Sequence, residues 1–143
     1  MGRVAAWFAG AWFGALLAIG GLAAPAAFAA APRDVAGRIV ARLFAQEAAL
    51  GIGMAVALLL LLRRLARDRA EAGTGSQFST DLVLLLAAVA CTVGGYYAVQ
   101  PMMEAARAGQ GSLSFGALHG LSMGAYGLKT ILVGALAWRL TQR

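Results

Sequence analysis

Four long apolar runs constrain this chain more than any other feature. The third, Leu82 to Val99, has eighteen residues without a charge, close to the roughly 20 that an α-helix needs to cross the hydrocarbon core of a membrane. The others are Val4 to Ala31, Ala48 to Leu62 with an amphipathic lead from Asp34, and Phe115 to Trp138. The sequence therefore predicts an all-α polytopic membrane protein with four transmembrane helices.

The composition agrees with lipid as the main solvent. Of the 143 residues, 61% are hydrophobic and 13% are charged, whereas soluble domains have about 25% charged residues. The length and the uniform composition predict a single transmembrane domain over 1–143. The single cysteine, Cys91, excludes an internal disulfide. The net charge of +6 comes from basic residues that flank apolar runs, so we expect the lipid bilayer, and not nucleic acid, as the partner.

The limits of the runs predict helices over about 4–31, 36–63, 81–107 and 114–139, with a cytoplasmic loop over 64–80. The first run has a rival interpretation as a cleaved secretory signal, because PAAFAAAP follows a basic start and an apolar stretch. The run is about twice as long as the usual apolar core of such signals, and Gly10 and Gly14 suit a helix that packs closely on its neighbours. We therefore expect this helix to be retained.

Arginine distribution predicts the orientation. With a cytoplasmic N-terminus, seven arginines lie on the inner side and four on the outer side, and basic residues concentrate on the cytoplasmic side of membrane proteins. The very short connection at Pro32-Arg33 makes the first two helices a hairpin. We predict a four-helix antiparallel bundle with both termini cytoplasmic, located in a bacterial cytoplasmic (inner) membrane.

Four short patterns in order give the chain a family resemblance. They are APAAF, PRDVAGRIVARLF, QPMM and FGALHGLS, which close or open successive helices. Together they resemble the transmembrane protein 205-like family, catalogued as domain of unknown function 4149, over nearly the whole chain except the Arg63 to Thr80 loop. The resemblance implies a small four-helix membrane protein without an established enzymatic activity, and one branch of the family is associated with tolerance to platinum drugs. Where relatives tend to carry asparagine, this chain has Tyr126.

Polar groups inside the apolar runs are candidates for a site, because ionisable side chains in hydrocarbon are expensive. His119, six residues in from Leu113, and Glu47, nine residues in from Arg38, lie about 10–14 Å below the outer surface at the rise of an α-helix. We predict an outward-facing polar pocket with the following candidates: His119, Ser122, Tyr126, Glu47, Gln46, Arg42 and Gln100. The alternative, which we favour, is that His119 and Ser122 only hydrogen-bond across helices and lock the bundle.

Other candidates are interpreted as structural. Gly116, Gly120 and Gly124, like Gly10 and Gly14, are expected to form small faces that pack against neighbouring helices. Lys129 lies ten residues before Arg139, so we expect its stem to reach the cytoplasmic interface; a catalytic lysine is the alternative. His119 and Met123 would suit a soft metal ion, but packing is the favoured interpretation, and no metal or cofactor is expected.

Three classes of function follow. We favour an accessory protein that acts by helix packing, as a homo-oligomer or within a larger membrane complex. The alternative is a carrier or channel for a small solute or soft metal ion, which requires self-association because four short helices enclose little volume. An oxidoreductase-like or haem-handling enzyme needs more ligands than the sequence offers, so no enzymatic activity is expected.

Overall fold

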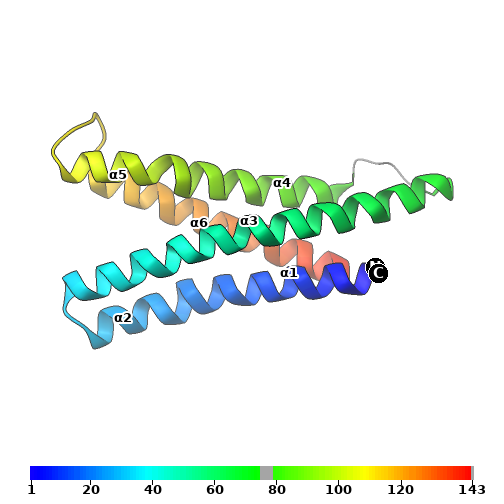
Figure 1. Cartoon of the computed structure of the whole chain (residues 1–143), viewed down its shortest axis with the longest axis horizontal. Helices are drawn as coiled ribbons and strands as arrows, with labels where there is room; N and C mark the ends of the chain where they lie inside the picture. The colour runs from blue at the N-terminus through cyan, green and yellow to red at the C-terminus, as the bar shows by residue number, and fades with distance from the viewer. Residues whose placement is uncertain (75–78, 143) are drawn as a thin grey trace.

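In the computed structural model, four long helices lie side by side along one axis (Figure 1). The structure describes residues 1–74 and 79–142. Four helices within these ranges are long and apolar enough to cross a membrane: Gly2–Ala30, Arg33–Glu71, Thr80–Arg107 and Phe115–Thr141. The described ranges contain no strand. The all-helical prediction with four candidate spans is confirmed, and the four apolar helices indicate an integral membrane protein.

The first and third spans share an interruption. The first consists of α1 (Gly2–Leu17), the π-helical segment η1 (Ala18–Ala23) and α2 (Ala24–Ala30). The third consists of α4 (Thr80–Thr92), the π-helical segment η2 (Val93–Ala98) and α5 (Val99–Arg107). Each π-helical segment contains a Gly-Gly pair and precedes a proline, Pro25 or Pro101. Because proline lacks an N–H group and crowds the preceding turn, a wider turn before it keeps the helix continuous.

The second span, α3 (Arg33–Glu71), is longer than expected, so the loop predicted over 64–80 is wrong for residues 64–71. The stretch RRLARDRAE is charged, but arginine, leucine, alanine and glutamate are good helix formers. Beyond the helix, Gly73 has a φ of +70°, the conformation in which glycine commonly ends helices. Residues 75–78 of the predicted loop lie outside the described residues, and α4 begins at Thr80.

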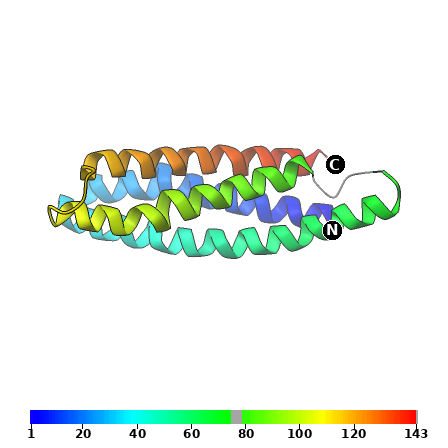
Figure 2. The ribbon, with the colours of Figure 1, turned by 90° about the horizontal axis from the view of Figure 1, so that it is seen from above.

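Serine side chains cap two of the helices. Ser79 accepts a hydrogen bond from the N–H of Leu82 at the start of α4, and Ser114 accepts one from the N–H of Ala117 at the start of α6 (Phe115–Thr141). Such caps satisfy the free N–H groups of a first helical turn. Figures 1 and 2 show both termini at one end of the bundle, with the α2–α3 and α5–α6 connections at the other.

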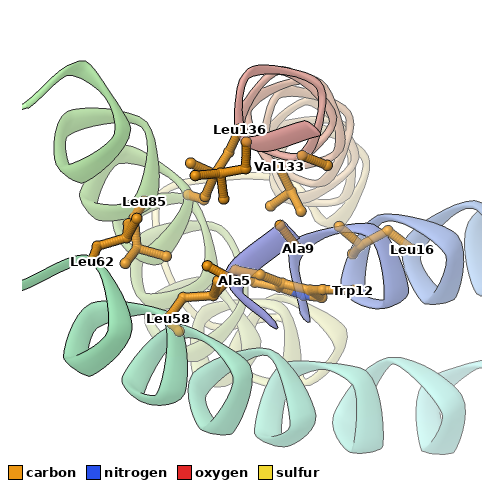
Figure 3. Packing of buried hydrophobic residues seen from close by; sticks show 13 residues of the cluster. Ala5, Ala9, Trp12, Leu16, Leu58, Leu62, Leu85, Val133 and Leu136 are labelled. Carbon is orange, nitrogen blue, oxygen red and sulfur yellow. The ribbon is translucent and has the colours of Figure 1, made fainter. Parts of the chain in front are cut away.

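The main hydrophobic core lies among α1, α3, α4 and α6 (Figure 3). On α1 the buried residues are Ala5, Ala9, Trp12 and Leu16, whose spacing of three and four residues places them on one helix face. Arg139, near the end of α6, donates from Nε to Oδ1 of Asp81 at 2.9 Å, which joins the first turn of α4 to the last turns of α6. The hydrophobic core and the Arg139–Asp81 ion pair together keep the helices packed against one another at this end of the bundle.

Candidate functional site

A buried ion pair lies between α3 and α6. Nζ of Lys129 donates to Oε2 of Glu47 at 2.7 Å, and the two side chains are 3% and 2% exposed. Glu47 follows Arg33, the first residue of α3, by the same number of residues as Lys129 follows Phe115, the first residue of α6. Because α3 and α6 begin at the same end of the bundle (Figure 1), the two charges meet at the same level.

The expectation that Lys129 reaches the cytoplasmic interface is wrong. Its ammonium group bonds to Glu47 and lies 4.9 Å from the centre of the Tyr126 ring. A charged group at the centre of a bilayer costs several kcal/mol, so a carboxylate at the same depth keeps it inside. The sequence-based prediction counts the depth of Lys129 from Arg139 and the depth of Glu47 from Arg38. These two arginines lie at opposite ends of the bundle. Counting both from the helix starts that the structure shows, Arg33 and Phe115, places the two charges at the same level.

Tyr126 connects α6 to the first span, one turn before Lys129. Its hydroxyl group donates to the carbonyl oxygen of Leu16 at 2.8 Å. Leu16 lies in the last turn of α1, next to the change to the π-helical pattern of η1, and side-chain donors are the groups that satisfy backbone carbonyls at such interruptions inside a membrane. A Cβ at Gly20 would lie 2.7 Å from Cε1 of the Tyr126 ring. Glycine in η1 therefore allows the tyrosine to approach, and Phe44 packs edge-on against the same ring.

Trp12 and Gly51 border the ion pair on the side of α1. Trp12 is 1% exposed. A Cβ at Gly51 would lie 3.3 Å from Oε1 of Glu47 and 3.4 Å from Nε1 of Trp12. Among the described residues neither Oε1 nor Nε1 has a hydrogen-bond partner. Trp12, Glu47, Tyr126 and Lys129 together form what we term the buried polar cluster, to which α1, α3 and α6 all contribute.

His119 does not belong to this cluster. Its side chain is exposed and its ring stacks on that of Phe115, with 5.8 Å between the centroids. The guanidinium group of Arg107 lies 4.6 Å from the centre of the same phenylalanine ring. His119 is therefore part of a surface stack beside the α5–α6 connection, and the structure does not bring it to Glu47.

The remaining pocket candidates are dispersed. Arg42 and Gln46 are exposed, and Gln100 and Ser122 are half-buried. No hydrogen bond within the described ranges links any of them to Glu47 or His119. Of the seven residues predicted for the pocket, Glu47 and Tyr126 are brought together, whereas Trp12 and Lys129 were missed as their neighbours.

The glycines expected to pack lie on the outside of the bundle. A Cβ at Gly10 or Gly14, or at any member of the row Gly116, Gly120 and Gly124, would meet no atom within 4 Å apart from the glycine's own helix backbone and chain neighbours. At these glycines, therefore, no other helix of the described ranges comes within contact distance of a Cβ position. Close approaches occur instead at Gly20, Gly95 and Gly134, where a Cβ would meet Tyr126, Ala125 and Phe13. Gly20 and Gly95 both belong to Gly-Gly pairs before a proline, a signal the sequence does contain.

A soft-metal site at His119 and Met123 gains no further ligands from the fold. Both side chains are exposed on α6, and residues 1–74 and 79–142 contain no group of three histidine, cysteine, aspartate or glutamate side chains able to hold a metal ion. The chemistry that the fold does assemble is that of the buried polar cluster, in which an ammonium group, a carboxylate, a phenol and an indole N–H lie together inside the bundle.

Comparison with known proteins adds one finding. The family model described as domain of unknown function (DUF4149) matches residues 7–112. This range holds Trp12 and Glu47 but ends before α6. No curated protein and no solved structure matches the chain significantly. Because the family model covers well over half of the sequence, the chain belongs to the domain of unknown function 4149 family.

Proposed function

We propose that this protein is an accessory protein of a bacterial cytoplasmic membrane that acts by packing its helices against a partner, either another copy of itself or a helix of a larger complex. The observation that carries the proposal is the glycine row of α6, Gly116, Gly120 and Gly124, which lies on the outside of the bundle, where a Cβ would meet no atom of another described helix within 4 Å. In lipid, helices associate through close van der Waals packing, and rows of small residues let their backbones approach.

The interior of the bundle supports the same proposal. The charges of Glu47 and Lys129 neutralise each other within the chain, and Tyr126 bonds to the backbone of α1. Groups engaged in this way stabilise the arrangement of the spans, and they are not free to act on a substrate in the same state. Large apolar side chains also border the glycine row on the outside, among them Met123 and Leu121, which are 54% and 58% exposed.

The proposal includes an antiparallel bundle with both termini in the cytoplasm. The shared end of the two termini (Figure 1) and the arginines of the last turns of α3, Arg63, Arg64, Arg67 and Arg69, support it. These arginines lie at the same end as Arg3, and such a concentration of basic residues is typical of the cytoplasmic side.

A leucine in the glycine row tests the packing proposal. We expect Gly120→Leu to abolish self-association or copurification of the partner in mild detergent, because the added side chain holds the partner helix away. The matched control is Gly53→Leu, the same change on the outer face of α3, where a Cβ also meets no atom within 4 Å. Light scattering gives the oligomeric state and mass spectrometry identifies copurified proteins. A wild-type protein that is monomeric and purifies alone, or an unaffected Gly120→Leu variant, would contradict the proposal.

A carrier for a small solute is the second candidate. It is favoured by the ion pair inside the bundle together with the Gly/Pro interruptions at corresponding positions of the first and third spans, since interrupted helices in both halves of a membrane protein often mark a transport site. On this hypothesis Glu47→Gln abolishes solute uptake into proteoliposomes while the protein still folds. On the packing hypothesis the same variant loses stability, and the partner is retained by the molecules that remain folded.

A further inference from the structure

The buried polar cluster holds a hydrogen-bond donor and an acceptor that border the same small region. The indole Nε1 of Trp12 can only donate, and Oε1 of the ionised Glu47 can only accept. The two residues are 1% and 2% exposed, and within the described ranges neither atom has a hydrogen-bond partner. A buried polar group without a partner costs about 1–3 kcal/mol, and hydrocarbon supplies no substitute. Both atoms therefore require a partner that residues 1–74 and 79–142 do not provide.

The position of Gly51 sets an upper limit on the distance between Nε1 of Trp12 and Oε1 of Glu47. Both lie within 3.4 Å of the position that a Cβ of Gly51 would occupy, so their separation cannot exceed twice that distance. They do not form a direct hydrogen bond with each other. A molecule that accepts one hydrogen bond and donates another, each of about 2.8 Å, bridges two atoms that are up to about 5.6 Å apart, which covers most of the range that this limit allows. Water is the smallest molecule that does both, and buried waters make about two to four hydrogen bonds to protein groups.

We propose that a single water molecule is bound inside the bundle between Nε1 of Trp12 and Oε1 of Glu47, beside Gly51. It accepts a hydrogen bond from the indole N–H and donates one to the carboxylate oxygen that Lys129 does not use. The site links α1 to α3 at the level of the ion pair. It requires glycine at position 51, because a methyl group there lies in contact with both polar atoms. The site is independent of the glycine row on α6.

The test uses the three tryptophans of the chain. In protein labelled with ¹⁵N at the indole nitrogens and held in nanodiscs, we expect the Trp12 N–H to show cross-relaxation with water in NMR spectra, although its side chain is buried. Trp7 and Trp138, 75% and 68% exposed, give reference signals for indoles on the outside of the bundle. Assignment follows from Trp12→Phe, which removes one of the three signals.

Two glycines of α3 supply the matched variants. Gly51→Ala is expected to remove the water cross-peak of Trp12, and Gly53→Ala, where a Cβ meets no atom within 4 Å, is expected to keep it. A wild-type Trp12 signal without cross-relaxation would overturn the proposal, whether or not the variants fold. A cross-peak that persists in Gly51→Ala would also overturn it, since it would then arise from the labile protons of Lys129, which that variant retains.

Discussion

Glu47 and Lys129 depend on each other because each is tolerated inside the bundle through the charge of the other. Removing two charges from water costs several kcal/mol per ion, and a single short contact offsets this only if both partners are present. Deleting one partner leaves an uncompensated charge, whereas deleting both removes the problem. The pair therefore restricts α3 and α6 to the one register in which both charges are neutralised. It adds less to the net free energy of folding than its short distance suggests.

Single and double substitutions should behave differently at this pair. We expect Lys129→Met to reduce the free energy of unfolding by about 3–5 kcal/mol, and the double variant Glu47→Leu with Lys129→Leu to be close to the wild type or more stable. Reversible unfolding in mixed micelles measures both. The control is Arg38→Met, which breaks an exposed pair with Asp34 and should change stability by less than about 1 kcal/mol. A wild-type stability for Lys129→Met would mean that Lys129 lies at the membrane interface after all.

At the scale of elements, each of the two π-helical segments has a glycine that lies close to a residue of α6, and these two residues of α6 are neighbours in the sequence. Gly20 of η1 faces Tyr126, and Gly95 of η2 faces Ala125, so closely that a Cβ at either glycine would clash. The other member of each Gly-Gly pair, Gly21 or Gly94, faces open space. The first and third spans therefore both approach α6 closely about one turn before Lys129, and the widened turns lie where that approach occurs.

Adjacent glycines allow this contact to be tested with an internal control. We expect Gly95→Ala to destabilise the protein by about 1–3 kcal/mol, because the methyl group overlaps Cβ of Ala125 and forces η2 away from α6. Gly94→Ala should be neutral or stabilising by up to about 1 kcal/mol, since nothing lies near its Cβ and alanine favours a helix over glycine. Thermal unfolding of both purified variants under the same detergent conditions gives the comparison. Equal effects would show that only the helix propensity of glycine matters here.

For the molecule as a whole, apolar run length was enough to predict four spans, because hydrocarbon thickness dictates helix length. The end of α3 could not be predicted by the same rule: beyond the membrane, charge no longer indicates where a helix stops, and Gly73 does. The likeness to transmembrane protein 205 stays a resemblance, while membership of the DUF4149 family is confirmed.

The candidate site was less predictable than the fold. Periodicity places His119, Ser122 and Tyr126 on one side of α6, but it does not say which side faces α3. That choice depends on packing: Lys129 is buried on α6 together with Val133, Leu136 and Leu140, whereas His119, near the start of the helix, is exposed. The predicted depth of Glu47 also starts from Arg38, which lies inside α3 and not at its first residue. For this reason the sequence does not identify Lys129 as the partner of Glu47.

The orientation of the whole molecule can be tested with single cysteines in a Cys91→Ala background. We expect Ser112→Cys, on the exposed α5–α6 connection, to react with a membrane-impermeant maleimide in intact cells. Thr74→Cys, exposed beyond α3, should react only after the membrane is permeabilised, because it lies on the arginine-rich side. The opposite labelling pattern would place both termini outside the cytoplasm.

The buried ion pair also has a consequence for the order in which the protein is made. Lys129 lies 82 residues after Glu47 in the chain, and synthesis proceeds from the N-terminus. The carboxyl group of α3 is therefore synthesised before its partner, and the ammonium group follows with α6. Biogenesis of this protein thus includes a step in which α6 packs against α3 and its ammonium group neutralises the buried carboxylate.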